Sequence, residues 1–250
     1  MTGLVLAAGL GKRLAPLTEE RPKGLIELGG RTLLARLLDG LQAAGVQETV
    51  LVVGYRQEMI RAALGPSHRG MALRYAVNPA FEKGPRLSLW TGRAEFARDD
   101  VVLADGDVLF APALLEGVVR AAAPNVFLGE PDFVDTGEEI NLYHAGERVV
   151  AIRRGVSGPP GAPYEARAEW VGFAKVGRAG GAALAAGLDA MVREGRVDGD
   201  YEVALDDLLG RHPFTMCPTD GLPWIEIDFP QDLHAAETEI LPRIARLARA

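Results

Sequence analysis

The chain has 250 residues, 48% of them hydrophobic, with a formal net charge of −7 and one cysteine, Cys217. A chain of this length suits one α/β domain, and its acidic balance without a Lys/Arg run argues against a nucleic-acid partner. The single cysteine excludes an internal disulfide. Because no leader pattern and no apolar run of about 18 residues occurs, we expect a cytoplasmic protein without a membrane span.

The first 110 residues alternate between strand-like and helix-like segments. Val/Leu-rich runs predict strands at 3–8, 48–54, 72–77 and 100–105, and leucines at helical spacing with amphipathic patterning predict helices at 31–45 and 55–65. This alternation is typical of crossover units that build a Rossmann-like doubly wound sheet.

The second half contains more strands. We expect a helix over 111–122, followed by strands at 125–131, 139–144 and 148–154. A Pro/Gly-rich surface loop over 155–163, which could serve as a lid, comes next. The remaining elements that we expect are a strand at 169–176, helices at 181–194 and 201–210, a strand at 224–228 and a helix from Gln231 onward. The strands at 139–144 and 148–154 should form a hairpin. The prediction is an α/β fold with a mostly parallel mixed sheet and a small β insertion in the second half.

The stretch from Leu6 to Lys23 is the most informative part of the chain. It follows a strand-like run, breaks at Gly9 and Gly11, and then supplies Arg13 and Lys23 as cations. Glycines let the backbone approach phosphate oxygens closely, and its N–H groups can point at the anion. The stretch is neither a P-loop nor a dinucleotide fingerprint, which would need a glycine at position 14. A nucleotide is therefore the first ligand to expect.

The joint pattern of Leu-Ala-Ala-Gly-x-Gly-x-Arg, Pro16-Leu17-Thr18 and Pro22-Lys23 resembles the signature of the nucleotidyltransferase family that contains sugar-1-phosphate nucleotidylyltransferases and the phosphocholine and inositol-phosphate cytidylyltransferases. The resemblance implies that Arg13 clamps the β/γ-phosphates with its planar guanidinium and that Lys23 lies at the α-phosphate. The nucleotide-binding residues that it implies are Leu6, Ala7, Ala8, Gly9, Gly11, Arg13, Lys23, Asp105 and Gly106.

Two acidic segments follow apolar strands and are candidates for a metal site. Transfer of a nucleotidyl group requires neutralisation of a triphosphate, usually by Mg²⁺ held by one or two carboxylates. One strand runs into Asp105-Gly106-Asp107, and a later one is Trp224-Ile225-Glu226-Ile227-Asp228. The family resemblance assigns the metal to Asp107 and Asp228 and leaves Asp105 as a supporting residue. Whether Glu226 also binds the metal stays open, because alternation along a strand does not decide which acid coordinates.

The acceptor is expected after the third strand and in the second half. Hexose-1-phosphate enzymes of the family carry a Gln-Pro-x-Gly-Leu-Ala segment there, whereas this chain reads Asn78 to Trp90. That replacement favours the cytidylyltransferase branch, as does Glu169-Trp170-Val171-Gly172. The acceptor-binding residues expected from the resemblance are Asn78, Arg86, Ser88, Asn141, Glu169 and Trp170. This chain has Pro85-Arg86 where the relatives have asparagine or glycine-asparagine, and Arg86 either binds a phosphate or carboxylate of the acceptor or faces solvent.

Two kinds of acceptor remain open at this point. A choline acceptor would need an aromatic cage for its quaternary ammonium, for which Trp90, Trp170, Tyr143 and Phe173 are available, although aromatic residues at such positions are commonly core. A polyol such as inositol would instead use Asn141, Glu139 and Glu169.

The leading hypothesis is a metal-dependent cytidylyltransferase that uses CTP and Mg²⁺. A phosphate or phosphonate oxygen of a small anionic acceptor (phosphocholine, aminoethylphosphonate or inositol phosphate) would attack the α-phosphorus, and pyrophosphate would leave. One alternative is a sugar-1-phosphate nucleotidylyltransferase that uses UTP, dTTP or GTP. Another is a catalytically silent regulatory relative, which has no chemical need for all four of Arg13, Lys23, Asp107 and Asp228. We expect one domain over 1–250, with a nucleotide-binding half (1–110) and an acceptor-binding half (111–250), and leave a homodimer open.

Overall fold

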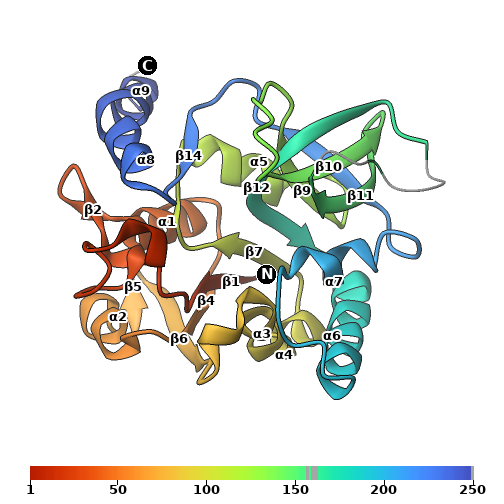
Figure 1. Ribbon diagram of the computed structural model, residues 1–250, viewed down its shortest axis with the longest axis horizontal. Coiled ribbons are helices and arrows are strands. Elements are labelled where there is room, and N and C mark those ends of the chain that lie inside the picture. The colour runs from red at the N-terminus through yellow and green to blue at the C-terminus, as the bar shows by residue number, and fades with distance from the viewer. Residues whose placement is uncertain (156–157, 159–162, 249–250) are drawn as a thin grey trace.

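The computed structural model describes residues 1–155, 158 and 163–248. Among these residues, ten strands form one sheet that runs through both halves of the chain (Figure 1). Their order across the sheet is β10 (Ile140–Ala145), β11 (Arg148–Arg154), β13 (Phe214–Pro218), β9 (Val126–Glu130), β12 (Ala166–Val176), β7 (Val101–Asp105), β1 (Thr2–Ala7), β4 (Glu48–Val53), β6 (Met71–Val77) and β5 (Ser67–His68).

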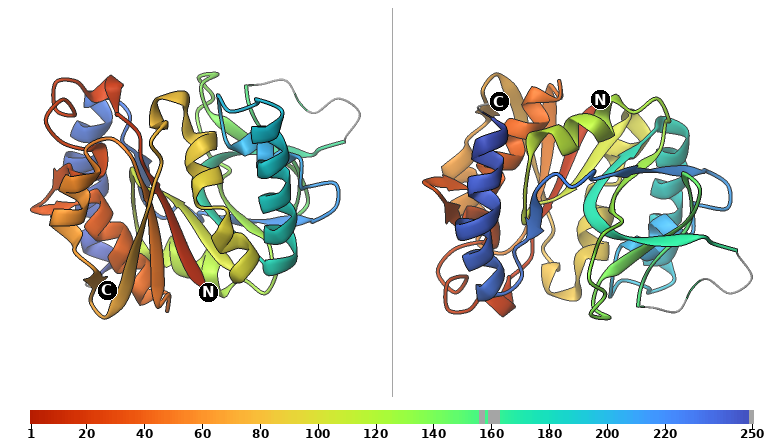
Figure 2. Two further views of the ribbon diagram at one scale, coloured as in Figure 1. Left: turned by 90° about the horizontal axis from the view of Figure 1, so that it is seen from below. Right: turned by 90° about the horizontal axis from the view of Figure 1, so that it is seen from above.

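The strands β7, β1, β4 and β6 are parallel and are covered on both faces. Alternate residues of a strand point to opposite faces, so Leu4 and Val5 of β1 enter different cores. The face of Val5 packs on α1 (Leu33–Ala43), α2 (Gln57–Leu64) and α5 (Pro112–Arg120), and the face of Leu4 packs on α3 (Pro85–Thr91), α4 (Ala94–Arg98) and α6 (Arg178–Arg193), as Figure 2 shows. This arrangement confirms the Rossmann-like doubly wound fold.

The second half of the sheet is more antiparallel than the first. The long strand β12 pairs antiparallel with β7, β9 and β10, and β10 and β11 form the expected hairpin. Parallel pairing outside the first half joins β9 to β13. The sheet is therefore mixed, and the parallel strands are concentrated in the half that carries the glycine motif.

Several elements were not expected from the sequence pattern. The helices α3 and α4 fill the segment between β6 and β7, and β13 forms where no strand was predicted. The expected strand at 224–228 is the short β14 (Trp224–Glu226), which lies outside the main sheet and pairs with β8 (Val108–Phe110). The predicted loop over 155–163 lies mostly outside the described residues.

The C-terminal segment packs beside the glycine motif. It consists of α8 (Pro230–Ala235), a π-helical turn η4 (Ala236–Ile240) and α9 (Leu241–Leu247), and it shares an apolar cluster with Leu14, Leu28 and Leu33. Short elements complete the chain: the 3₁₀ turns η1 (Lys12–Leu14), η2 (Lys23–Leu25) and η3 (Phe81–Lys83), the strand pair β2 (Glu27–Leu28) and β3 (Arg31–Thr32), and α7 (Glu202–Asp206). The start and the end of the chain thus meet around the motif.

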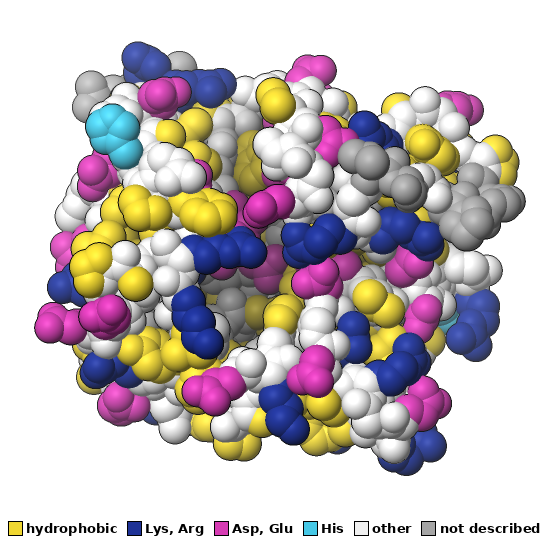
Figure 3. All heavy atoms as spheres, in the orientation of Figure 1, with side chains coloured by type: hydrophobic (Ala, Val, Ile, Leu, Met, Phe, Trp, Pro, Cys, Tyr) yellow, Lys and Arg dark blue, Asp and Glu magenta, His cyan; other side chains and the backbone are white. Residues whose placement is uncertain are grey.

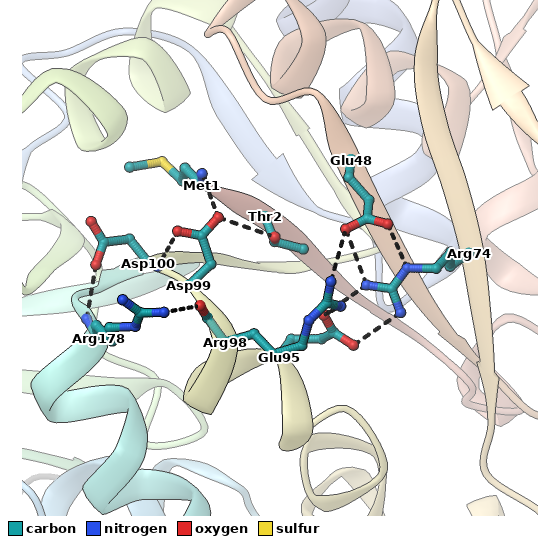
Figure 4. A network of polar contacts seen from close by, with 9 residues as sticks. All are labelled: Met1, Thr2, Glu48, Arg74, Glu95, Arg98, Asp99, Asp100 and Arg178. Atoms are coloured by element: carbon teal, nitrogen blue, oxygen red, sulfur yellow. Dashed lines mark hydrogen bonds and ion pairs between the residues drawn. The ribbon is translucent and has the colours of Figure 1, made fainter.

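A polar network joins the amino-terminal end of β1 to its neighbours (Figure 4). The guanidinium of Arg74 binds the carboxylates of Glu48 and Glu95, and the amino group of Met1 pairs with Asp99 at 2.5 Å. These contacts tie β1, β4, β6 and α4 together at one end of the parallel strands. The glycine motif begins at the other end of β1. Among the described residues, no helix has the length and apolar character needed to cross a bilayer.

Candidate active site

The glycine motif forms a loop that starts at the carboxyl end of β1. Gly11 has a left-handed φ of 62°, and a Cβ there would lie 3.0 Å from Thr18 Cγ2 and 3.2 Å from Lys23 Cβ. The Thr18 hydroxyl donates to the Gly11 carbonyl at 2.8 Å. Gly9 differs, because a Cβ at that position would meet no atom within 4 Å. Gly11 is therefore needed to fold the loop, whereas Gly9 keeps the space in front of it open.

The two motif cations point at the carboxylates of the later strands. Lys23 Nζ donates to Asp107 Oδ2 at 2.7 Å and to Asp228 Oδ1 at 2.5 Å. Arg13 donates from Nη1 to Asp228 Oδ2 at 2.8 Å, and its guanidinium lies over the Phe229 ring. The cations and carboxylates predicted from separate parts of the sequence thus meet at one point.

The pairing of β8 with β14 brings the acidic segments together. Asp107 immediately precedes β8, its carbonyl accepts a hydrogen bond from Ile227 N at 3.1 Å, and Glu226 lies opposite Val108. Ligand atoms of Asp107, Glu226 and Asp228 consequently lie within 4.8 Å of one another. Asp107 Oδ1 is buried without a hydrogen-bond partner among the described residues. Three carboxylates with an unsatisfied oxygen are a donor set that fits a hard divalent cation.

The electrostatics of this cluster follow from its crowding. Removal from water and then repulsion by Asp107 and Asp228 raise the pKa of Glu226 to about 8, although its side chain still opens onto the surface. Burial opposes ionisation of Asp228, but Lys23 and Arg13 outweigh it and hold the pKa of this carboxyl below its ordinary value. Burial likewise disfavours the charged form of Lys23, and the surrounding carboxylates reverse this effect and raise its pKa. The site is a compact cluster of opposite charges.

Two cavities meet at the cluster. The loop cavity, of about 300 Å³, is lined by Leu6, Ala7, Gly9, Gly11, Lys12, Arg13, Lys23, Gly24, Gly106, Asp107 and Asp228. The larger one, of about 920 Å³, shares Arg13, Asp107 and Asp228 with it and extends between β9, β12 and β14. The space-filling view shows the corresponding face hollowed near its centre, with basic and acidic side chains beside each other at the rim (Figure 3).

We call the larger space the acidic cavity. Its described lining includes the acids Asp105, Asp107, Glu130, Asp132, Glu138, Glu139, Glu169, Asp200, Glu202, Glu226, Asp228 and Asp232 against two basic residues, Arg13 and Arg154. Glu130 and Glu169 are direct cross-strand partners. Burial and then repulsion by Glu139 and Glu130 raise the pKa of Glu169 to about 7. The walls therefore attract cations.

Two of the predicted nucleotide-binding residues lie away from the loop cavity. Asp105 faces the acidic cavity and accepts a hydrogen bond from the hydroxyl of Tyr201 at 2.7 Å. Ala8 is buried, and its carbonyl accepts from Tyr55 N at 3.0 Å. The other predicted nucleotide-binding residues, Leu6, Ala7, Gly9, Gly11, Arg13, Lys23 and Gly106, all line the loop cavity.

The residues predicted around the third strand are internal. Asn78 Nδ2 donates to Ser88 Oγ at 3.1 Å, and both side chains are buried. Arg86 is also buried, and its guanidinium donates to the carbonyls of Asp200 at 3.0 Å and Arg196 at 3.3 Å. Arg86 therefore does not face solvent, which was one of the two alternatives. Its hydrogen bonds to these backbone carbonyls join α3 to the segment before α7.

The residues predicted on the later strands divide between cavity and core. Glu169 and Trp170 line the acidic cavity, while Asn141 is fully buried and donates to the Gly155 carbonyl at 3.2 Å. The aromatic cage considered for choline does not assemble, because Trp90, Tyr143 and Phe173 are not among the described residues that line either cavity. Tyr143 bonds the Gly155 carbonyl and Phe173 packs on Phe110, so these rings belong to the core.

The acidic-cavity residues that the sequence analysis missed include Glu130, Tyr201 and Glu202. Glu130 ends β9, and Tyr201 and Glu202 lie at the start of α7. Glu130 carried a usable signal, since it is a charged residue at the end of an apolar strand. Tyr201 and Glu202 carried none, because only the packing of α7 against the sheet brings them to the site.

Comparisons with known proteins identify relatives of this chain. Residues 3–132 match the MobA-like NTP transferase domain. The chain is 34% identical over 248 residues to CMP-5'-(3-aminopropyl)phosphonate synthase of Streptomyces rubellomurinus, an alignment that covers 96% of this chain and 38% of that protein. It is 38% identical over 120 residues to UTP–glucose-1-phosphate uridylyltransferase AglF of Haloferax volcanii, covering 48% and 49% of the two chains. The aligned segments thus span less than half of each of these relatives.

A solved structure supports the fold. CTP:phosphocholine cytidylyltransferase from Streptococcus pneumoniae superimposes with a TM-score of 0.76 at 21% identity, over 96% of this chain and 98% of that one. At this level of identity the likeness concerns the fold alone.

Proposed function

The chain belongs to the MobA-like NTP transferase domain family, and from this premise we propose that it is a metal-dependent cytidylyltransferase that transfers CMP from CTP to a small phosphorylated alcohol or phosphonate and releases pyrophosphate. One observation carries the proposal. The cations Arg13 and Lys23 converge on Asp107 and Asp228 at the boundary between two cavities, so that a donor on one side and an acceptor on the other would meet there.

The residues of the loop cavity hold the triphosphate. Its small residues let the backbone approach phosphate oxygens, and Arg13 presents a planar fork to the β/γ-phosphates. Lys23 lies where negative charge develops at the α-phosphate. The acceptor oxygen is already anionic at neutral pH, so the reaction needs no general base. Catalysis then rests on holding the attacking and leaving oxygens in line.

Asp107 and Asp228 would hold Mg²⁺, with Glu226 close enough to be a third ligand. Bound there, the metal would supply neutralisation of phosphate charge. The chain's own contribution is the orientation of these carboxylates: the hydrogen bond from Ile227 N to the Asp107 carbonyl fixes one segment against the other. Asp232 accepts from the backbone N–H groups of Asp228 and Phe229 and so fixes the second segment.

The acidic cavity favours an acceptor that also carries a cationic group. Its phosphate or phosphonate end would lie at Arg13 and Lys23, and an ammonium end would lie among Glu130, Glu139 and Glu169. An ammonium donates three hydrogen bonds to carboxylates and would relieve their mutual repulsion. The name of the Streptomyces relative, a CMP-5'-(3-aminopropyl)phosphonate synthase, supports the same class. We therefore favour an aminoalkyl phosphonate or phosphate over an inositol phosphate.

A second candidate is a sugar-1-phosphate nucleotidylyltransferase that uses UTP, dTTP or GTP. The resemblance of the first half to the uridylyltransferase AglF favours it. The acidic cavity disfavours it, since a hexose phosphate brings no cation to offset the carboxylates. A catalytically silent relative is less consistent with the joint presence of the two cations and two carboxylates.

A substrate matrix tests the proposal. Pyrophosphate release is measured with CTP, UTP, dTTP and GTP against aminoethylphosphonate, aminopropylphosphonate, phosphocholine, inositol 1-phosphate and glucose 1-phosphate, with Mg²⁺ present. We expect turnover with CTP and an aminoalkyl acceptor. Turnover with UTP and glucose 1-phosphate but none with CTP would replace the proposal by the second candidate. Glu169→Gln should raise KM for the amine acceptor while leaving KM for CTP near the native value.

The homodimer, the division into halves at residue 110 and the cytoplasmic location remain predictions.

A further inference from the structure

Lys23 occupies the centre of the carboxylate cluster. Its ammonium group lies 2.7 Å from Asp107 Oδ2 and 2.5 Å from Asp228 Oδ1, and its side chain is only 13% exposed. These distances are hydrogen-bonding distances for a charged pair. One lysine therefore bridges both of the carboxylates to which we assign the metal.

The bridge uses the oxygens that a metal would need. Both oxygens of Asp228 are engaged, one by Lys23 and the other by Arg13, while Asp107 has only Oδ1 left without a partner. A divalent cation placed between these carboxylates would lie within a few ångströms of the ammonium group. Two cations that close repel each other, and partial burial weakens the screening by water.

The backbone next to Lys23 is closely packed, so we expect movement of this residue to come from its side chain. Lys23 opens the 3₁₀ turn η2, and a Cβ on the following Gly24 would meet Leu34 Cγ at 2.6 Å. The four-carbon stem, in contrast, has several rotatable bonds and ends in the loop cavity. The ammonium can swing from the carboxylates toward the side where the phosphates would bind while the loop stays in place.

We propose that Lys23 is an internal cation that a divalent metal displaces from Asp107 and Asp228, and that its release toward the triphosphate couples metal binding to nucleotide binding. The inference rests on the metal site of the proposed function. The ammonium group of Lys23 then has two positions. It binds the carboxylates when no metal is present, and it binds phosphate oxygens when the metal is present. Metal and nucleotide then favour each other's binding, because each removes a competitor of the other.

Metal affinity tests the competition. Binding of Mn²⁺ alone, without nucleotide, is measured by titration calorimetry for the native protein and for Lys23→Gln, Lys23→Arg and Lys12→Gln. Lys12 lines the same cavity without an ion pair among the described residues, so Lys12→Gln controls for the general loss of one positive charge. We expect Lys23→Gln to bind Mn²⁺ at least about tenfold more tightly than the native protein, within the usual range of coupling between sites. Lys23→Arg and Lys12→Gln should stay near the native affinity.

The possible results distinguish a failure of the metal site from a failure of the displacement of Lys23. If no variant binds Mn²⁺, the metal site itself is wrong and the displacement falls with it. If all four proteins bind Mn²⁺ equally, the metal site stands and the displacement is overturned. If Lys12→Gln gains as much Mn²⁺ affinity as Lys23→Gln, the gain comes from the general loss of one positive charge, and the displacement is likewise overturned.

A measurement on the native protein covers the case in which Lys23→Gln does not fold. Lysines are labelled with an amine-reactive reagent, with and without saturating Mg²⁺, and quantified by mass spectrometry. Lys23 should react slowly without metal and several-fold faster with it, whereas the exposed Lys12 should react equally in both states. Labelling of Lys23 that Mg²⁺ leaves unchanged would overturn the displacement.

The coupling to nucleotide is tested in EDTA with the non-hydrolysable α,β-methylene analogue of CTP. Asp107→Asn removes one of the two carboxylate charges that bind Lys23, and it should increase the affinity for the analogue in the absence of metal several-fold. Asp132→Asn, which removes a charge from the same acidic cavity without a contact to Lys23, should increase it less. Equal gains in the two variants would contradict the transfer of Lys23 to the phosphates.

Discussion

The hydroxyl of Tyr201 donates a hydrogen bond of 2.7 Å to Oδ2 of Asp105, the last residue of β7. Burial, then repulsion by Asp107 and Glu202, raises the pKa of the Asp105 carboxyl well above its ordinary value, and the Tyr201 hydroxyl is the partner that offsets part of this effect. A Cβ on Gly172 would lie 2.9 Å from the same oxygen. Asp105 is thus held by close neighbours at the wall of the acidic cavity, two residues before Asp107, which suits a residue that supports the site.

Tyr201→Phe should therefore destabilise the fold. The ring is kept, but the half-buried Asp105 oxygen loses its donor, and leaving such a group unsatisfied costs up to about 1–3 kcal/mol. Urea unfolding at neutral pH measures the loss. Tyr164→Phe is the matched control, because Tyr164 is exposed and its hydroxyl makes no hydrogen bond among the described residues. Equal free energies of unfolding for native protein and Tyr201→Phe would show that the bond contributes nothing.

Asp107→Ala should abolish turnover and leave the fold intact. The variant loses a carboxylate at the shared boundary of the two cavities, and we expect a fall in kcat/KM of about a hundredfold or more, beyond what loss of a metal's outer contacts costs. Circular dichroism and pyrophosphate release measure the two properties. Asp198→Ala removes an exposed acid outside both cavities and should keep native activity. Near-normal turnover in Asp107→Ala would remove Asp107 from the metal site.

The parts of the site that were predictable from sequence depend on local patterns. Gly9 and Gly11 follow an apolar strand, and Asp107 follows another, so their common edge of the sheet could be expected from the rule that ligands bind at the carboxyl ends of strands. The contact of Lys23 with Asp107 and Asp228 agrees with that expectation. Their roles as phosphate and metal ligands stay predictions.

The parts that were not predictable depend on packing between distant segments. Arg86 was considered for the acceptor, but the carbonyls that it binds belong to Arg196 and Asp200, and no pattern near Arg86 announces them. The acidic cavity likewise forms only when β9, β12 and α7 come together. Short elements with mixed composition, such as β13, are strands here because their neighbours offer free backbone groups, and the sequence alone does not contain that information.

Gly9→Val should impair nucleotide binding without destabilising the protein. A side chain at this position meets no protein atom and would project into open space at the loop cavity, where we place the triphosphate. We expect an unchanged melting temperature and a loss of CTP affinity of about tenfold or more. A tenfold loss corresponds to about 1.4 kcal/mol of binding free energy. Gly187→Val, whose Cβ also meets nothing within 4 Å but lies on α6, tests the same substitution away from the site. CTP affinity that survives in Gly9→Val would move the triphosphate away from this loop.

Glu169→Gln should make the protein more stable at high pH and leave its stability unchanged at low pH. The folded carboxyl has a pKa of about 7, above the ordinary value of 4.5, because of burial and then repulsion by Glu139 and Glu130. An unfolded chain releases this proton near its ordinary pKa, so the native protein loses stability as the pH rises from about 4.5 to 7, and the cost is complete above that range. Glutamine keeps the shape without the charge.

Since Glu169 is partly open to the acidic cavity, solvent screening reduces the gain to roughly 1–2 kcal/mol at pH 8. Urea unfolding at pH 4 and pH 8 measures it, and Glu147→Gln, which removes an exposed carboxylate at the β10–β11 turn, should change little at either pH. An aminoalkyl phosphonate should shrink the difference between the native protein and Glu169→Gln at pH 8, because the ammonium would stabilise the charged carboxylate of the native protein alone. A gain in stability at pH 4 equal to that at pH 8 would show that ionisation of Glu169 is not its cause.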